Sequence, residues 1–153
     1  MLAAAIFASG GDLEISASLS GYNLLIPESR CCAFSLTVTP NGRVMTRVLV
    51  PGGPRVKRFT LSAEEMASLR RTIEEARFFD LPDDLGPAAI DGDEHVMQIR
   101  MGKQSRRVEL DEWPENWSDA SYLSREQLGH TRRAVAVWSA IRALVTEPEA
   151  KVP

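Results

Sequence analysis

The first half of the chain alternates hydrophobic and polar residues with a period of two, the spacing typical of strands that bury one face. Leu13, Ile15, Ala17 and Leu19 alternate with polar residues in this way. The same alternation returns on both sides of a turn in residues 31–50, and again in residues 55–61. Together these segments predict four strands before any helix begins.

The turn inside residues 31–50 decides how two of these strands pair. A two-residue Asn41-Gly42 loop would bring Arg47 onto the apolar face. A three-residue loop, residues 40–42, instead pairs Thr39 with Arg43. The apolar residues that then share one face are Phe34, Leu36, Val38, Val44, Val48 and Val50. Because a slip of one residue would turn this whole set outward, we predict the three-residue loop.

Spacings of three and four residues replace the alternation after residue 61 and predict a helix over residues 62–79. Ser62 and Glu65 are expected to form a capping box at its start. The predicted apolar stripe consists of Met66, Leu69, Ile73, Ala76 and Phe79. Phe78 is expected beside this stripe and Arg77 in the last helical turn. A proline shortly afterwards disfavours further helix, so a surface loop should follow.

The second half of the chain predicts one more hairpin and one more helix. Residues 94–110 form the hairpin, closed by a two-residue Gly102-Lys103 turn. This turn pairs Ile99 with Arg106, so the Arg106 side chain must reach outward from the apolar face. Residues 124–145 carry a helical stripe that begins at a predicted serine cap.

The order of these elements predicts a single α+β domain over residues 1–153. We expect two layers, an antiparallel sheet of about five to six strands with two helices on one face. Residues 1–11 are either the remnant of a signal peptide or an extra strand, and residues 147–153 are expected to fray. The compartment therefore stays open between the cytoplasm and the periplasm.

Charge and hydropathy narrow the classes of partner. The chain holds 18 basic and 21 acidic residues, for a net charge of −3. Its arginine pairs, at residues 70–71, 106–107 and 132–133, are scattered among acids, so we expect no nucleic-acid binding. No segment approaches the roughly 20 apolar residues of a membrane helix, so we expect a soluble protein without membrane contact.

The loop after the first helix is rich in acids and raises the question of a metal site. Its acidic residues are Asp80, Asp83, Asp84, Asp91, Asp93 and Glu94. The spacing of a calcium-binding EF-hand is missing. Asp91, Asp93 and His95 are weak candidate metal ligands, although Asp91-Gly92 is equally a turn signal. His95 falls on the apolar side of its strand, where we expect a hydrogen-bonded, partly buried histidine.

Other candidate chemistry is sparse. Cys31 and Cys32 are adjacent, which makes a disulfide between them geometrically poor. No nucleophile elbow, Walker loop or zinc-protease motif is present, so we expect neither an enzyme nor a cofactor. Trp113 and Trp117 flank a proline in a polar loop. They are candidates for partner contact, because tryptophan is enriched at binding hot spots, and the alternative is burial over the end of the sheet.

The capping box, the "FFDLP" run, the loop with Asp91, the hairpin and the C-terminal helix together resemble small uncharacterised bacterial domains. This region, residues 62–145, is also similar to emfourin, an inhibitor of thermolysin-like metalloproteases. The resemblance implies a compact non-enzymatic domain that binds another protein, as a protease inhibitor or an immunity-type protein does. The alternative is a metal-ion or small-ligand binding domain that uses the acidic residues 83–95.

Overall fold

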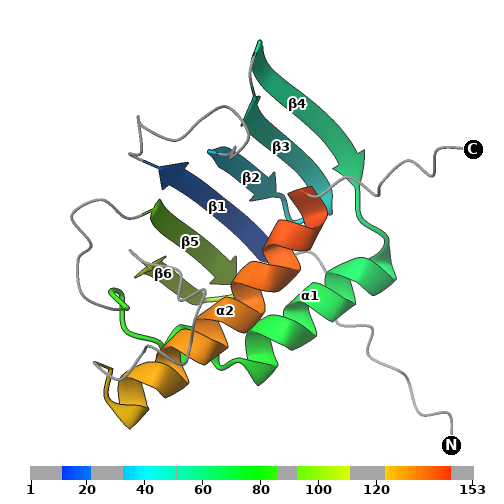
Figure 1. The fold of residues 1–153 in the computed structure, drawn as a ribbon. Coiled ribbons are helices and arrows are strands. Elements are labelled where there is room, and N and C mark those ends of the chain that lie inside the picture. The colour runs from blue at the N-terminus through cyan, green and yellow to red at the C-terminus, as the bar shows by residue number, and fades with distance from the viewer. Residues whose placement is uncertain (1–11, 22–32, 51, 86–92, 111–122, 146–153) are drawn as a thin grey trace, which may run out of the picture.

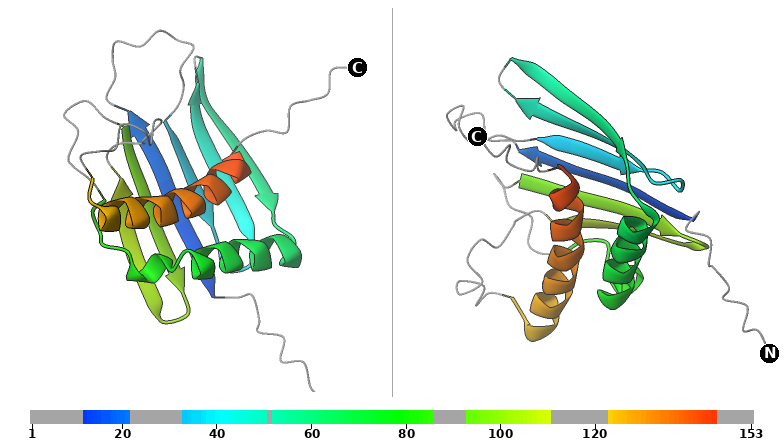
Figure 2. Two further views of the ribbon diagram at one scale, coloured as in Figure 1. Left: turned by 60° about the horizontal axis from the view of Figure 1, so that its bottom comes forward. Right: turned by 90° about the vertical axis from the view of Figure 1, so that its right-hand side faces the viewer.

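The computed structural model describes residues 12–21, 33–50, 52–85, 93–110 and 123–145. It shows a six-stranded antiparallel sheet with two helices packed on one face (Figures 1 and 2). This confirms the predicted two-layer α+β fold. The predicted N-terminal extension, residues 1–11, and the predicted frayed tail, residues 147–153, lie outside the described residues.

The sheet is built around the first strand. The strands are β1 (Leu13–Gly21), β2 (Phe34–Val38), β3 (Arg43–Val50), β4 (Gly53–Thr60), β5 (Asp93–Met101) and β6 (Gln104–Leu110). Their spatial order is β4-β3-β2-β1-β5-β6, so β1 pairs with β2 on one side and with β5 on the other. The helices are α1 (Ala63–Glu75) and α2 (Arg125–Val145). The edge strands β4 and β6 therefore lie at opposite ends of the sheet.

Both predicted hairpin registers are confirmed. Val38 pairs with Val44, and the Thr39 amide donates to the Arg43 carbonyl at 2.9 Å, as the three-residue loop requires. In the second hairpin Ile99 pairs with Arg106. In the first hairpin, side-chain alternation was sufficient to predict the register, because the two-residue loop would have placed Arg47 on the apolar face. In the second hairpin the two-residue turn set the register, although Arg106 pairs opposite Ile99.

The core lies between the sheet and the helices. From α1 the buried side chains are Met66, Leu69 and Ile73, and from α2 they include Ala134, Trp138 and Ile141. The Trp138 ring packs against Phe34 with centroids 5.4 Å apart. Both helices begin with reciprocal serine caps, Ser62 with Glu65 and Ser124 with Gln127. These caps confirm the predicted helix starts.

The end of α1 differs from the prediction. The helix ends at Glu75, and Arg77 adopts a left-handed backbone with φ 50° and ψ 48°. A short 3-10 turn, η1 (Phe78–Asp80), follows. Phe78 is 0% exposed and Phe79 is only partly buried, which is the reverse of the predicted roles. The left-handed residue resets the helical periodicity, so Arg77 lies beyond the helix and the apolar stripe cannot continue to Phe79.

Candidate functional site

The acidic residues that follow α1 are engaged in structural contacts. Asp80 pairs with Arg77 at 2.9 Å, and Asp83 accepts from Arg106 of β6 at 2.8 Å. The backbone of Asp84 forms an isolated parallel bridge with Glu109. These contacts attach the start of the loop to β6.

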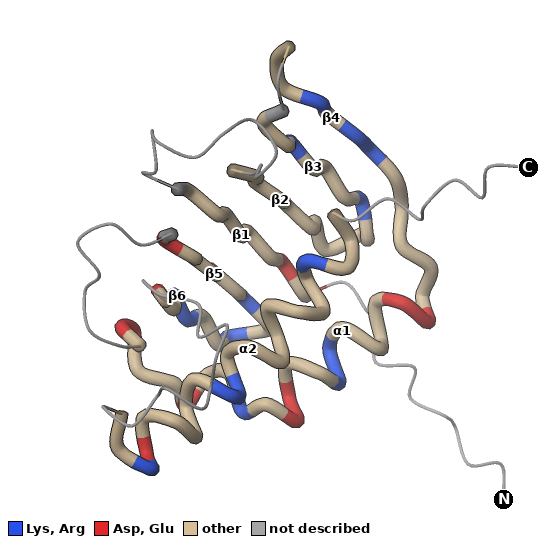
Figure 3. The backbone as a smooth tube through the Cα atoms, in the orientation of Figure 1, with Lys and Arg blue, Asp and Glu red and all other residues tan. Residues whose placement is uncertain are grey.

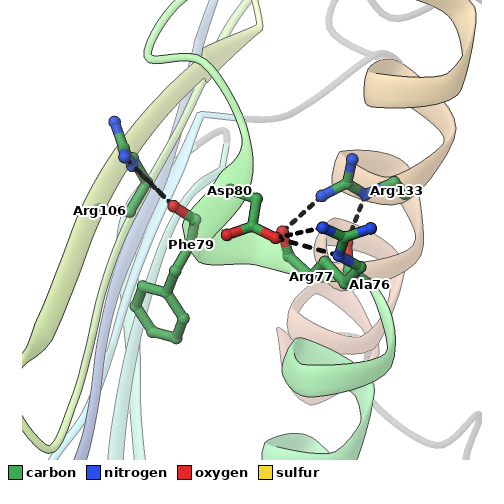
Figure 4. Close-up of polar contacts among 6 residues, drawn as sticks. All are labelled: Ala76, Arg77, Phe79, Asp80, Arg106 and Arg133. Carbon is green, nitrogen blue, oxygen red and sulfur yellow. Dashed lines mark hydrogen bonds and ion pairs between the residues drawn. The ribbon is translucent and has the colours of Figure 1, made fainter. Parts of the chain in front are cut away.

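Arginines from two other elements bond the carbonyl groups where α1 ends (Figure 4). Arg133 of α2 donates to the Ala76 and Arg77 carbonyls, both at 2.6 Å. Arg106 donates to the Phe79 carbonyl at 3.3 and 3.2 Å. Carbonyls at the end of a helix lack partners within the helix, so this cluster caps α1 from outside. The bonded carbonyls lie on both sides of Phe78 in the chain.

His95 lies inside the fold. It is 3% exposed, and its Nδ1 lies 3.2 Å from the Leu110 carbonyl oxygen. Since a carbonyl only accepts, Nδ1 carries the proton in this contact. The Trp138 ring meets the imidazole edge to face, with centroids 4.9 Å apart. The prediction of a hydrogen-bonded histidine on the apolar face is confirmed.

Of the weak metal candidates, His95 is the one whose side chain lies in the described part of the chain. Asp91 lies outside it, and Asp93 is described only as the first backbone residue of β5. Among the described residues there is no group of three His, Cys, Asp or Glu side chains that could hold a metal ion. Trp113, Trp117, Cys31 and Cys32 also lie outside the described residues.

The sheet face opposite the helices exposes large hydrophobic side chains. Met45 and Leu49 of β3 and Val56 of β4 are 41%, 56% and 45% exposed, and they are the large hydrophobic side chains exposed in the described part of the chain. The strand register intersperses them with arginines: Arg43 faces Thr60, Met45 faces Arg58, and Arg47 faces Val56. We call this group the outer patch; it consists of Arg43, Met45, Arg47, Leu49, Val56 and Arg58.

Positive charge is concentrated on the same two strands. Residues 33–63 contain five basic residues and no acidic residue, whereas the other 13 of the 18 basic residues share the rest of the chain with all 21 acids. Figure 3 shows these basic positions along β3 and β4. Arg43, Arg47, Arg55 and Arg58 form no ion pair with a described residue. The arginine pairs singled out in the sequence are scattered, so this cluster becomes visible only when the strands are paired.

A groove of about 420 Å³ opens within the outer patch. Its lining includes Thr37, Thr39, Arg43, Met45, Arg58 and Thr60. Val44 and Phe59 complete the lining, so the groove combines two guanidinium groups and three hydroxyls with a mostly apolar surface. Such a lining suits an apolar group that carries a carboxylate, which arginine binds through paired hydrogen bonds.

The comparisons with known proteins add no family. No family model matches the chain, and no curated protein matches it. In the described part of the chain, neither helix is long and apolar enough to cross a membrane.

Proposed function

We propose that this chain is a non-enzymatic protein-binding domain and that the outer patch is its binding face. The observation that carries the proposal is the gathering of Met45, Leu49 and Val56 on a sheet face that no described helix covers. Exposed apolar side chains gathered with polar groups mark interaction sites. Here arginines lie between the apolar side chains, which favours a partner with negative charge at the contact.

The composition of the patch favours a protein over other macromolecules. Single-stranded nucleic acids bind through aromatic side chains that stack on bases, and Phe59, the aromatic residue of β4, is partly buried against the core. The exposed apolar residues of the patch are aliphatic, and aliphatic side chains gain from burial against another protein. The net charge of −3 also weakens long-range attraction to nucleic acid.

The resemblance to emfourin makes a thermolysin-like metalloprotease the first partner class to test. In this form of the proposal the domain is an inhibitor, and the outer patch contacts the protease. The immunity-type form differs only in its partner, a toxin in place of a protease.

The test compares two charge-reversal variants of equal net charge. Arg47→Glu/Arg58→Glu alters the outer patch, whereas Arg71→Glu/Lys103→Glu alters two exposed positions on α1 and on the β5–β6 turn. Thermolysin inhibition, and retention of partners by the immobilised chain, are measured for both variants and for the unaltered protein. We expect at least tenfold weaker binding for the patch variant and little change for the control. Equal behaviour of the two variants would contradict the proposal.

A further inference from the structure

The exposed edge of β4 carries backbone groups in a regular array. β4 is an edge strand, and Leu61 donates to the Gly42 carbonyl at 2.9 Å directly after its last pair with β3. Antiparallel pairs alternate between bonded and non-bonded, so the Lys57 and Phe59 amides face β3. The amides of Val56, Arg58 and Thr60 therefore face away from the sheet. No described segment covers this edge.

At the opposite edge of the sheet, another segment of the chain bonds the outer side of β6. The Glu109 amide of β6 donates to the Asp83 carbonyl at 2.8 Å, and Leu85 donates to the Glu109 carbonyl at 3.0 Å. Another segment of the chain thus forms an isolated parallel bridge with β6 at Glu109. β4 is also an edge strand, but no segment in the described part of the chain bonds its outer side.

Resting on the proposed function, we propose that the partner contributes an extended acidic segment that pairs with the open edge of β4 as an additional antiparallel strand. Strand addition to a sheet edge gains main-chain hydrogen bonds from the edge, and neighbouring side chains then set its specificity. The side chains on β4 define the required pattern. Arg55 and Arg58 favour carboxylates opposite them, and Val56 and Phe59 favour apolar residues.

The charges on β4 select against other occupants. Basic residues and Pro54 on an edge strand discourage pairing with ordinary strands, because the charges must be desolvated. A carboxylate opposite each cation offsets that cost, so the same residues favour an acidic strand. A second copy of the chain pairing through β4 would bring cation against cation. A phosphate backbone could pair with the cations and accept from the outward amides, but it offers no donor for the outward carbonyls and no apolar group for Val56.

The test uses capped synthetic peptides with the full chain. The probe is Thr-Val-Glu-Glu-Val-Glu-Thr, which in antiparallel register places Glu opposite Arg58, Lys57 and Arg55. One matched control replaces each Glu by Gln. A second is N-methylated at the two residues opposite Arg58 and Val56, which keeps the charge but removes the donors that face β4. Binding is followed by fluorescence anisotropy at low salt. We expect each control to bind at least tenfold more weakly than the probe.

A charge exchange tests the register residue by residue. Arg55→Glu/Arg58→Glu should lose the probe and gain the peptide Thr-Val-Lys-Glu-Val-Lys-Thr, in which only the two facing positions are exchanged. A variant that had simply unfolded would bind neither peptide and would lose its circular dichroism spectrum.

Three results would overturn the strand proposal: equal binding of the N-methylated peptide, no rescue by the exchanged peptide in a folded variant, or stronger binding of single-stranded DNA or phosphatidylglycerol vesicles than of the probe. Failure of the proposed function is read separately, from partner loss in Arg47→Glu/Arg58→Glu. If Arg47→Glu/Arg58→Glu loses the partner but the unaltered chain does not bind the probe peptide, the outer patch binds its partner without strand addition to β4.

Discussion

The two edge strands of the sheet, β4 and β6, are treated differently by the rest of the chain. β6 is bonded on its outer side at Glu109 by residues 83–85, and its arginines contact Asp83, Glu109 and the Phe79 carbonyl. β4 carries three basic residues and is exposed on nearly all of its length. The two edges have similar backbones and similar lengths. Among the described residues, therefore, another segment bonds the outer side of β6 at Glu109, and none bonds the outer side of β4.

Hydrogen bonds to the outward backbone groups of an edge strand stabilise the fold. An edge strand without such bonds can pair with another chain. An open edge risks unwanted pairing, and chains reduce that risk with charge and proline. The β4 strand uses both devices, and its outer side is continuous with the outer patch. The predictions that follow probe how far stability depends on the β6 end and how little it depends on the β4 end.

The largest effect is expected where the covered edge joins the core. Phe78→Ala removes a ring that is 0% exposed and sits in η1, directly before the segment that covers β6. We expect a loss of about 3–5 kcal/mol in the free energy of unfolding, because a large buried side chain is replaced by a cavity. Urea denaturation measures it. Phe79→Ala, the matched neighbour, should cost clearly less; the opposite ranking would contradict the observed turn at Arg77.

A proline exchange compares the two edges directly. Glu109→Pro removes an amide that bonds Asp83, whereas Val56→Pro removes an amide that faces outward. Relative to the corresponding alanine variants, Glu109→Pro should cost about 1–3 kcal/mol more than Val56→Pro, the cost of a lost hydrogen bond with a group left unsatisfied. Thermal or urea unfolding provides the comparison. Equal costs would show that the β4 edge is not open.

The arginines of β6 should contribute more to stability than the arginines of β4. Arg106→Met leaves the Phe79 carbonyl without its donor and should lower stability by about 1–3 kcal/mol. Arg58→Met should change stability by less than about 0.5 kcal/mol, because Arg58 forms no ion pair with a described residue. A large loss of stability in Arg58→Met would show that the fold itself depends on the β4 edge.

The smallest effect concerns the central strand, away from both edges. Arg70 of α1 donates a hydrogen bond to Asp12, and this bond lowers the pKa of the Asp12 carboxyl below its ordinary value of 3.8. A lowered folded pKa stabilises the protein at neutral pH, and the stabilisation is lost as the pH falls below 3.8. Asp12→Asn should therefore be slightly less stable than the unaltered protein at pH 7 and equally stable in acid. A difference that persists at low pH would point to another cause.

Much of the fold could be predicted from local patterns, for reasons that particular residues make clear. Pro40 to Gly42 and Gly102-Lys103 fix turn lengths, and each turn length fixes which side chains share a face. The end of α1 could not be predicted in this way. Arginine seldom adopts a left-handed backbone, and the carbonyls around Arg77 are bonded by Arg133, which lies 56 residues away.

The candidate site escaped sequence reasoning for a related reason. Arg43 and Arg58 line one groove only because β3 and β4 pair side by side. Alternation assigns each strand an inner and an outer face, but it does not say which strand will end at an edge. The acidic residues after α1 are conspicuous in the sequence, but Asp80 and Asp83 are paired with arginines in the fold.

The most direct measurement compares the backbone amides of the two edges by NMR while the acidic probe peptide is added. The account predicts chemical-shift changes and slowed hydrogen exchange at Val56, Arg58 and Thr60, with the β6 amides from Gln104 to Leu110 unchanged. Equal perturbation of both edges, or changes confined to residues away from β4, would contradict the assignment of β4 as the partner edge.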